Sequence, residues 1–88
     1  MRILAVNWQD PKNPFAGGAE VHLWENLKRF VTAGHSVTLI CSQFEGGDPE
    51  DSYDGVRILR KGGRLYFNFV APGMIRTELK QNPYDIII

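Results

Sequence analysis

The sequence has one cysteine, no long hydrophobic run and no excess of charge of either sign. Cys41 is the only cysteine among 88 residues, so no disulfide forms within the chain and a reducing compartment suits it. No stretch approaches the roughly 18 apolar residues that cross a membrane. Ten basic residues balance ten acidic ones, which removes any global attraction for nucleic acid. These features favour a cytoplasmic protein without a nucleic-acid partner.

Two nucleotide-binding motifs are also missing. A dinucleotide fingerprint needs G-x-G-x-x-G directly after a strand and an acidic residue at the end of the next one, and neither occurs here. A P-loop signature is likewise absent. His22 and His35 are isolated, and no nucleophile lies in a pattern with a base and an orienting group. The sequence therefore predicts no cofactor, no metal site and no catalytic residue within this chain.

Apolar runs alternate with a helical pattern in the first half of the chain. Ile3–Val6 and Val37–Cys41 are continuous apolar runs, typical of strands that are covered on both faces. Between them, apolar residues recur at steps of three and four, and Gly34 is expected to end this helix. A strand, a helix and a second strand in this order predict a parallel βαβ unit. The fold class is therefore α/β, with a Rossmann-like parallel sheet and flanking helices.

The second half predicts further strands and a weaker helix. Asp54-Gly55 is a turn signal before a strand at Val56–Arg60, and a helix follows over Tyr66–Lys80. Pro72-Gly73 is expected to break or kink that helix. The apolar segment Tyr84–Ile88 predicts a core strand, which is an unusual place for a domain to stop. We expect residues 1–88 to be a partial domain that is truncated after this strand; the alternative is a complete small protein.

The loop between the first strand and the first helix is a candidate ligand site. It covers Asn7–Ala16, which is longer than the usual 2–6 residues, and it lies at the sheet edge where α/β proteins bind ligands. Gly17-Gly18 then opens the helix, where backbone N–H groups and the helix dipole favour an anion such as a phosphate. The alternative is that these glycines only permit the turn into the helix.

Three segments together suggest a family. Met1–Leu4, Gly17–His22 and Ala33–Ile40 resemble the beginning of retaining glycosyltransferases of family 4. The resemblance implies a GT-B fold, in which two Rossmann-like domains face each other across a cleft. The N-terminal domain of such enzymes receives the acceptor, and the C-terminal domain holds the nucleotide-sugar. The family's glycine-rich loop reaches the donor's diphosphate, and it maps onto Gly17 and Gly18.

This resemblance implies a fragment of a hexosyltransferase-type enzyme. The whole enzyme would move a sugar from a nucleotide-diphosphate sugar to a hydroxyl of a glycan, lipid or small molecule. Residues 1–88 form part of the acceptor-side domain and are expected to be inactive without the missing C-terminal domain. The alternative is a stand-alone flavodoxin-like module that binds a phosphate or another ligand without catalysis.

Three residues near the glycine pair are acceptor-side candidates. Glu20 lies in the first helical turn, where it either contacts a ligand or only complements the helix dipole. His22 either contacts acceptor hydroxyls or is solvated. Trp8 either stacks on a sugar or packs the loop against the sheet.

Charged residues gather in two neighbouring segments. The acidic segment from Glu45 to Asp54 is rich in glycine and is interpreted as a solvated loop, with metal binding as the minor alternative. A basic cluster follows, and it either neutralises the acidic loop or contacts an anionic acceptor or a membrane surface, as some family members do. Its members are Arg57, Arg60, Lys61 and Arg64.

Overall fold

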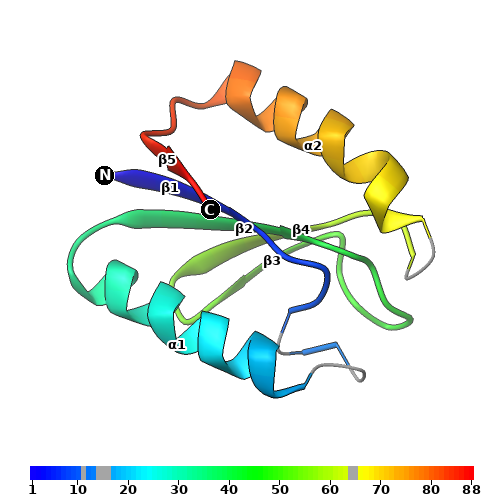
Figure 1. Cartoon of the computed structure of the whole chain (residues 1–88), viewed down its shortest axis with the longest axis horizontal. Helices are drawn as coiled ribbons and strands as arrows, with labels where there is room; N and C mark the ends of the chain where they lie inside the picture. Colours follow the sequence, from blue (N-terminus) through cyan, green and yellow to red (C-terminus); the bar gives the residue numbers. More distant parts are fainter. Residues whose placement is uncertain (11, 14–16, 64–65) are drawn as a thin grey trace.

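A five-stranded sheet lies between two helices in a three-layer arrangement (Figure 1). The computed structural model describes residues 1–10, 12–13, 17–63 and 66–88. Its strands are β1 (Arg2–Val6), β2 (Ser36–Cys41), β3 (Glu50–Tyr53), β4 (Val56–Arg60) and β5 (Ile86–Ile87), and its helices are α1 (Gly18–Thr32) and α2 (Phe67–Gln81). The predicted α/β class with a Rossmann-like sheet is confirmed.

The order of the strands is β3-β4-β2-β1-β5. β1 pairs in parallel with β2 and with β5, and β2 pairs in parallel with β4. In this register Ile3 lies beside Val37, and Leu39 lies beside Ile58. The βαβ unit is therefore parallel, as predicted, and the ends of β1, β2 and β4 meet at one edge of the sheet.

Each face of the sheet has its own apolar core, because side chains alternate across a strand. Ile3 and Ala5 pack toward α1 with its buried Trp24 and Leu27. Leu4, which lies between them, packs toward α2. Burial of a large aliphatic side chain contributes roughly 1.5–3 kcal/mol, so a strand with both faces covered gains from every position. This explains why the strand segments are continuous apolar runs.

Helix α1 ends at the glycine cap that was expected at Gly34. Gly34 has a φ of 95°, a left-handed conformation that favours glycine. Its N–H donates to the carbonyl of Val31, and the N–H of His35 donates to the carbonyl of Phe30. These two bonds form a Schellman motif, so His35 has a structural role at the helix end.

The expected break in the second helix is wrong. α2 continues from Phe67 to Gln81 with Pro72 inside it. Proline removes the one hydrogen bond that its missing N–H would donate to Asn68. Phe67 and Ala71 before Pro72, and Met74 and Ile75 after it, pack against the core on this face of the sheet, and this packing holds the helix together across the missing bond. No helix of the described residues is long and apolar enough to cross a membrane.

The acidic segment contains a strand that the sequence did not predict. β3 pairs antiparallel with β4 through a two-residue turn at Asp54 and Gly55, whose φ angles are 52° and 80°. Positive φ at both positions is the type I′ pattern of tight hairpins, so the turn signal was right. The interpretation of the whole segment as a solvated loop is wrong, because Glu50–Tyr53 extends the sheet.

The last strand is paired as predicted but is not a core strand. β5 lies at the edge beside β1, and Ile87 is 52% exposed. Both helices pack over β2, and α1 also packs over β4, so the β5 edge is left uncovered by them. The pairing continues at Ile88, whose N–H donates to the carbonyl of Leu4 at 2.8 Å.

Candidate functional site

The loop after β1 and the beginning of α1 lie at the carboxyl edge of the sheet, as predicted (Figure 1). Gly17 precedes the first turn of α1 and Gly18 opens it, and both are exposed. Residues 14–16 of the loop lie outside the described residues. The glycine pair is thus placed where an anion can approach the first backbone N–H groups of α1.

The backbone does not require glycine at either position. Gly17 has an extended conformation with φ of −123°, and neither Gly17 nor Gly18 has a positive φ. Among the described residues, a Cβ added at Gly18 would meet no atom within 4 Å, and one added at Gly17 would only touch Glu20 Oε2 at an ordinary 3.7 Å. Neither turn geometry nor crowding therefore explains the pair.

Glu20 caps the helix. The N–H of Gly17 donates to Glu20 Oε2 at 2.9 Å. Because Gly17 has no side chain, only this half of a capping box exists, and the carboxylate also complements the positive end of the helix dipole. Glu20 therefore lies at the positive end of the helix dipole, and its carboxylate occupies the position at which an external anion would meet Gly17.

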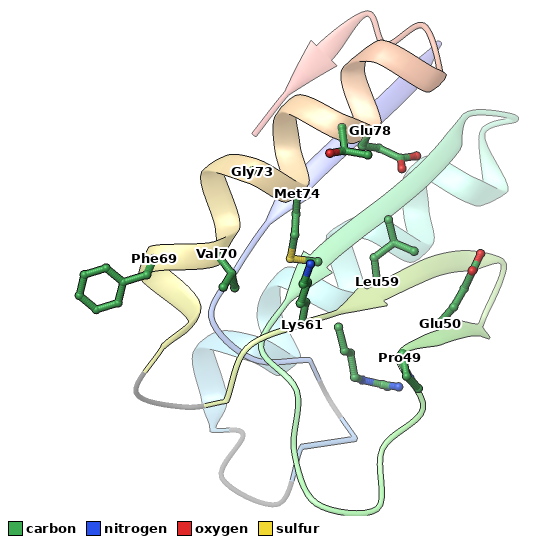
Figure 2. Close-up of a pocket in the computed structure, with 11 residues that line it drawn as sticks. Pro49, Glu50, Leu59, Lys61, Phe69, Val70, Gly73, Met74 and Glu78 are labelled. Atoms are coloured by element: carbon green, nitrogen blue, oxygen red, sulfur yellow. The ribbon is translucent and has the colours of Figure 1, made fainter.

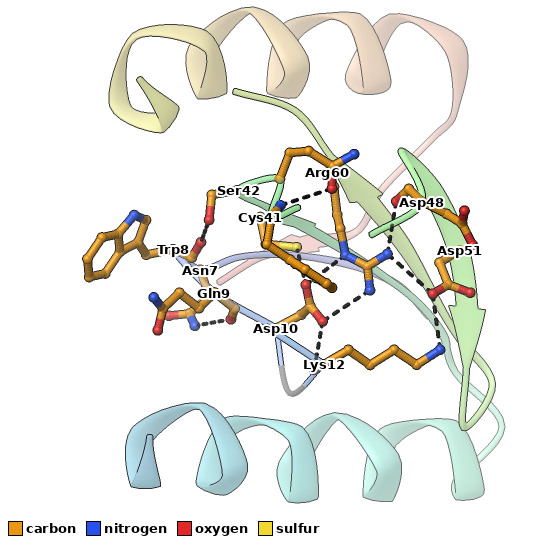
Figure 3. Close-up of polar contacts among 12 residues, drawn as sticks. Asn7, Trp8, Gln9, Asp10, Lys12, Cys41, Ser42, Asp48, Asp51 and Arg60 are labelled. Carbon is orange, nitrogen blue, oxygen red and sulfur yellow. Dashed lines mark hydrogen bonds and ion pairs between the residues drawn. The ribbon is translucent and has the colours of Figure 1, made fainter. Parts of the chain in front are cut away.

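Trp8 and His22 are both exposed. The carbonyl of Trp8 accepts a hydrogen bond from the N–H of Ser42 at 2.9 Å, which ties the loop to the end of β2. Trp8 is 43% exposed, and its ring points away from the polar cluster beside it (Figure 3). His22 lies exposed on α1, four residues after Gly18.

A buried ion pair holds the same loop, and sequence analysis missed it. Asp10 and Arg60 are both fully buried at their side chains, and Arg60 Nε and Nη2 lie 2.8 and 3.1 Å from the two oxygens of Asp10 (Figure 3). Asp10 also accepts bonds from the Lys12 N–H and from Cys41 Sγ. A bidentate pair with these further donors satisfies every oxygen, which a buried charge requires.

The network continues to the edge of the sheet. Arg60 Nη1 donates to the carbonyl of Asp48 at 2.9 Å and lies 3.2 Å from Asp51. Asp51 also pairs with Lys12 Nζ at 3.1 Å. The loop after β1 is therefore tied to β4, β3 and the segment before β3. This network fixes the loop at Asp10 and Lys12.

The environment of this network shifts two pKa values. Burial alone raises the pKa of Asp10, but the hydrogen bonds from Arg60 and from the Lys12 backbone outweigh it, so the pKa lies below its ordinary 3.8. Burial, and then the charge of Asp10, raise the pKa of the Cys41 thiol far above its ordinary value. Cys41 is therefore a protonated, unreactive core residue.

Most of the described basic cluster is used inside the molecule. Arg57 lies 2.7 Å from Glu78 and 3.1 Å from Glu50. Arg60 is the buried partner of Asp10. These two residues neutralise neighbouring carboxylates, which was one of the two predicted roles. Lys61 is exposed, and Arg64 lies outside the described residues. Within the described ranges, no group of three or more His, Cys, Asp or Glu could hold a metal ion.

Comparison with known protein families identifies the family of this chain. A family model described as Glycosyltransferase Family 4 matches residues 16–88, which is most of the chain. The chain belongs to glycosyltransferase family 4. No curated protein and no solved structure matches it. The match includes the glycine pair, both helices and every strand except β1.

Proposed function

We propose that this glycosyltransferase family 4 chain is the acceptor-side part of a retaining GT-B enzyme of the hexosyltransferase type. The enzyme transfers a sugar from a nucleotide-diphosphate donor to a hydroxyl of a glycan, lipid or small molecule, in the cytoplasm. The donor's nucleotide lies mainly on a second domain across the cleft. This chain alone binds the donor weakly and transfers no sugar.

One observation supports placing the donor's diphosphate at the glycine pair. Gly17 and Gly18 need neither a left-handed backbone nor space for a neighbouring atom, yet both positions lack a side chain at an exposed helix N-terminus. Close approach of the backbone to a ligand is a use of glycine that fits both positions. The N–H groups and helix dipole then stabilise negative charge that develops on the leaving diphosphate.

Glu20 sets a condition on this binding. Its carboxylate is 2.9 Å from the Gly17 N–H in the unliganded chain. A diphosphate oxygen takes the same N–H only when the carboxylate rotates away, since two anions cannot share one donor. Glu20 is therefore a cap that the donor displaces, and Trp8 and His22 are the proposed contacts of the acceptor.

Replacement of Gly18 by valine tests the proposal. Because a Cβ at Gly18 meets nothing within 4 Å, Gly18→Val leaves the fold intact while its side chain stands in the path of the diphosphate. We expect saturable millimolar binding of UDP, or of another nucleoside diphosphate, to the wild-type chain and its loss in Gly18→Val. The control is Gly73→Ala, which changes a glycine on the opposite face of the sheet and should leave UDP binding unchanged.

Three outcomes would count against the proposal. Binding that survives in Gly18→Val would remove the diphosphate from the glycine pair. Tight, micromolar binding to the chain alone would favour the alternative, a stand-alone flavodoxin-like binding module. Measurable sugar transfer by the chain alone would show that no second domain is needed.

A further inference from the structure

A groove lies between α2 and the β3–β4 hairpin, on the face of the sheet opposite α1 (Figure 2). Its volume is about 580 Å³, within the 300–1,000 Å³ of typical small-molecule sites. The groove exists because α2 packs over β2 and no Cα of α2 comes within 8 Å of β4. The outer part of this face therefore stays open beside the helix.

The two walls of the groove are formed by one face of β4 and one face of α2. Leu59 and Lys61 project to the same side of β4 and its extension, because alternate residues share a face. The facing side chains of α2 are spaced by three and four residues, which puts them on one helix face. They are Val70, Gly73, Met74, Thr77 and Glu78. Figure 2 shows Val70 and Met74 pointing toward Leu59 and Lys61 across the groove.

Gly73 keeps the α2 wall open. Glycine inside a helix is less stable than alanine, and Gly73 directly follows Pro72, the other poor helix former. Its φ is not positive, and a Cβ added there would meet no atom of the described residues within 4 Å. Neither the backbone nor close packing requires glycine here. Its consequence is unfilled space on the groove side of α2.

The groove has a single unpaired charge among its described lining residues. Glu50 and Glu78 both pair with Arg57, at 3.1 and 2.7 Å, and Arg60 pairs with Asp10. Lys61 is exposed and has no ion-pair partner in the described part of the chain. The groove therefore combines an apolar centre with one cation at its end.

We propose that this groove binds a small amphipathic anion. The apolar part lies between Leu59, Val70 and Met74, and the acidic group meets Lys61. Because Lys61 directly follows β4, the anionic end lies at the same carboxyl edge of the sheet as Gly17. The ligand's use as the sugar acceptor rests on the proposed function, whereas its binding in the groove does not.

Titration of the 88-residue chain with decanoate, below its micelle concentration, tests the proposal by amide NMR. We expect saturable shifts at Val70, Gly73 and Met74. Decyltrimethylammonium has the same apolar chain and the opposite charge, and it should bind more weakly. Lys61→Met should weaken decanoate binding about 2–5-fold, the effect of one exposed ion pair. Lys80→Met removes another exposed lysine, on the far end of α2, and should change nothing.

Two substitutions at Gly73 separate blockage from misfolding. Gly73→Leu fills the groove and should weaken decanoate binding at least about tenfold, as loss of an apolar contact surface of this size does. Gly73→Ala should keep binding while it stabilises the helix. Both variants should be folded, because the position has free space.

Undiminished decanoate binding to Gly73→Leu, or equal binding of the cationic amphiphile, would overturn the groove proposal. It would also be overturned if decanoate caused no shift in the groove while phosphatidylglycerol vesicles captured the chain. That result would indicate a membrane-binding surface instead. UDP titration at Gly17 and Gly18 is an independent readout, so failure of the groove and failure of the transferase proposal are distinguishable.

Discussion

At the scale of single residues, Asp10 and Arg60 hold the loop that leads to the glycine pair. Both side chains are fully buried, and their bidentate contact is supported by the Lys12 N–H and by Cys41. A buried pair stabilises little relative to an apolar pair, but loss of one partner leaves an uncompensated charge. The pair therefore acts mainly as a geometric constraint on the path of the loop.

Arg60→Met should strongly destabilise the chain. The free energy of unfolding should fall by about 3–5 kcal/mol, because Asp10 then remains buried without its partner. Lys12→Met is the control: its contact with Asp51 is exposed, so the loss should be about 1 kcal/mol or less. Urea unfolding measures both variants. Equal losses in the two would show that the Asp10–Arg60 pair is not a buried constraint.

The same pair predicts a dependence of stability on pH. The folded pKa of Asp10 is below its ordinary 3.8, so its contribution is fully present above that value. It is lost as the pH falls from 3.8 through the folded pKa. Asp10→Asn should be less stable at neutral pH and should lose less stability than wild type over this acidic interval. Parallel acid-unfolding curves of the two proteins would contradict this assignment.

At the scale of elements, a glycine in the β3–β4 hairpin and a glycine in α2 have opposite effects on stability. Gly55 has a φ of 80° in the β3–β4 turn, and a Cβ there would lie 2.7 Å from Val31 Cγ1. Gly73 lies in the interior of α2 beside open space. The first position needs glycine for both conformation and packing, and the second lowers the stability of its helix.

Alanine at these two positions should therefore change stability in opposite directions. Gly55→Ala should destabilise by more than about 1 kcal/mol, because a side chain is strained there and clashes with Val31. Gly73→Ala should stabilise by about 0.5–1 kcal/mol, the helix-propensity difference. Thermal unfolding distinguishes the two. A gain from Gly55→Ala, or a loss from Gly73→Ala, would mean that the local packing differs from that described.

Elements with a strong local sequence pattern were predicted correctly, and features that depend on distant residues were not. Ile3–Val6 and Val37–Cys41 were predictable because a strand between two helices is apolar at every position. Glu50–Tyr53 was not, since this edge strand is polar and only its Asp54-Gly55 turn indicated a hairpin. The Asp10–Arg60 pair lies 50 positions apart in sequence, and only the order of the strands brings it together.

At the scale of the whole molecule, the two proposed sites involve opposite faces of the sheet. Gly17 and Gly18 open α1 at the carboxyl edge, while the groove beside α2 lies on the opposite face and has Lys61 at the same edge. A donor phosphate and an amphipathic acceptor would thus approach one edge from two sides. Sequence similarity identified the family, but the paired arginines, the open Gly73 wall and the capped Gly17 required the structure.

The most direct measurement compares UDP with uridine in an amide NMR titration of the chain. Uridine has the same base and ribose but no diphosphate. The account predicts saturable shifts at Gly17, Gly18 and Glu20 with millimolar UDP and none there with uridine. Equal shifts with both ligands, or UDP shifts elsewhere while Gly17 and Gly18 stay unchanged, would contradict a diphosphate site at the N-terminus of α1.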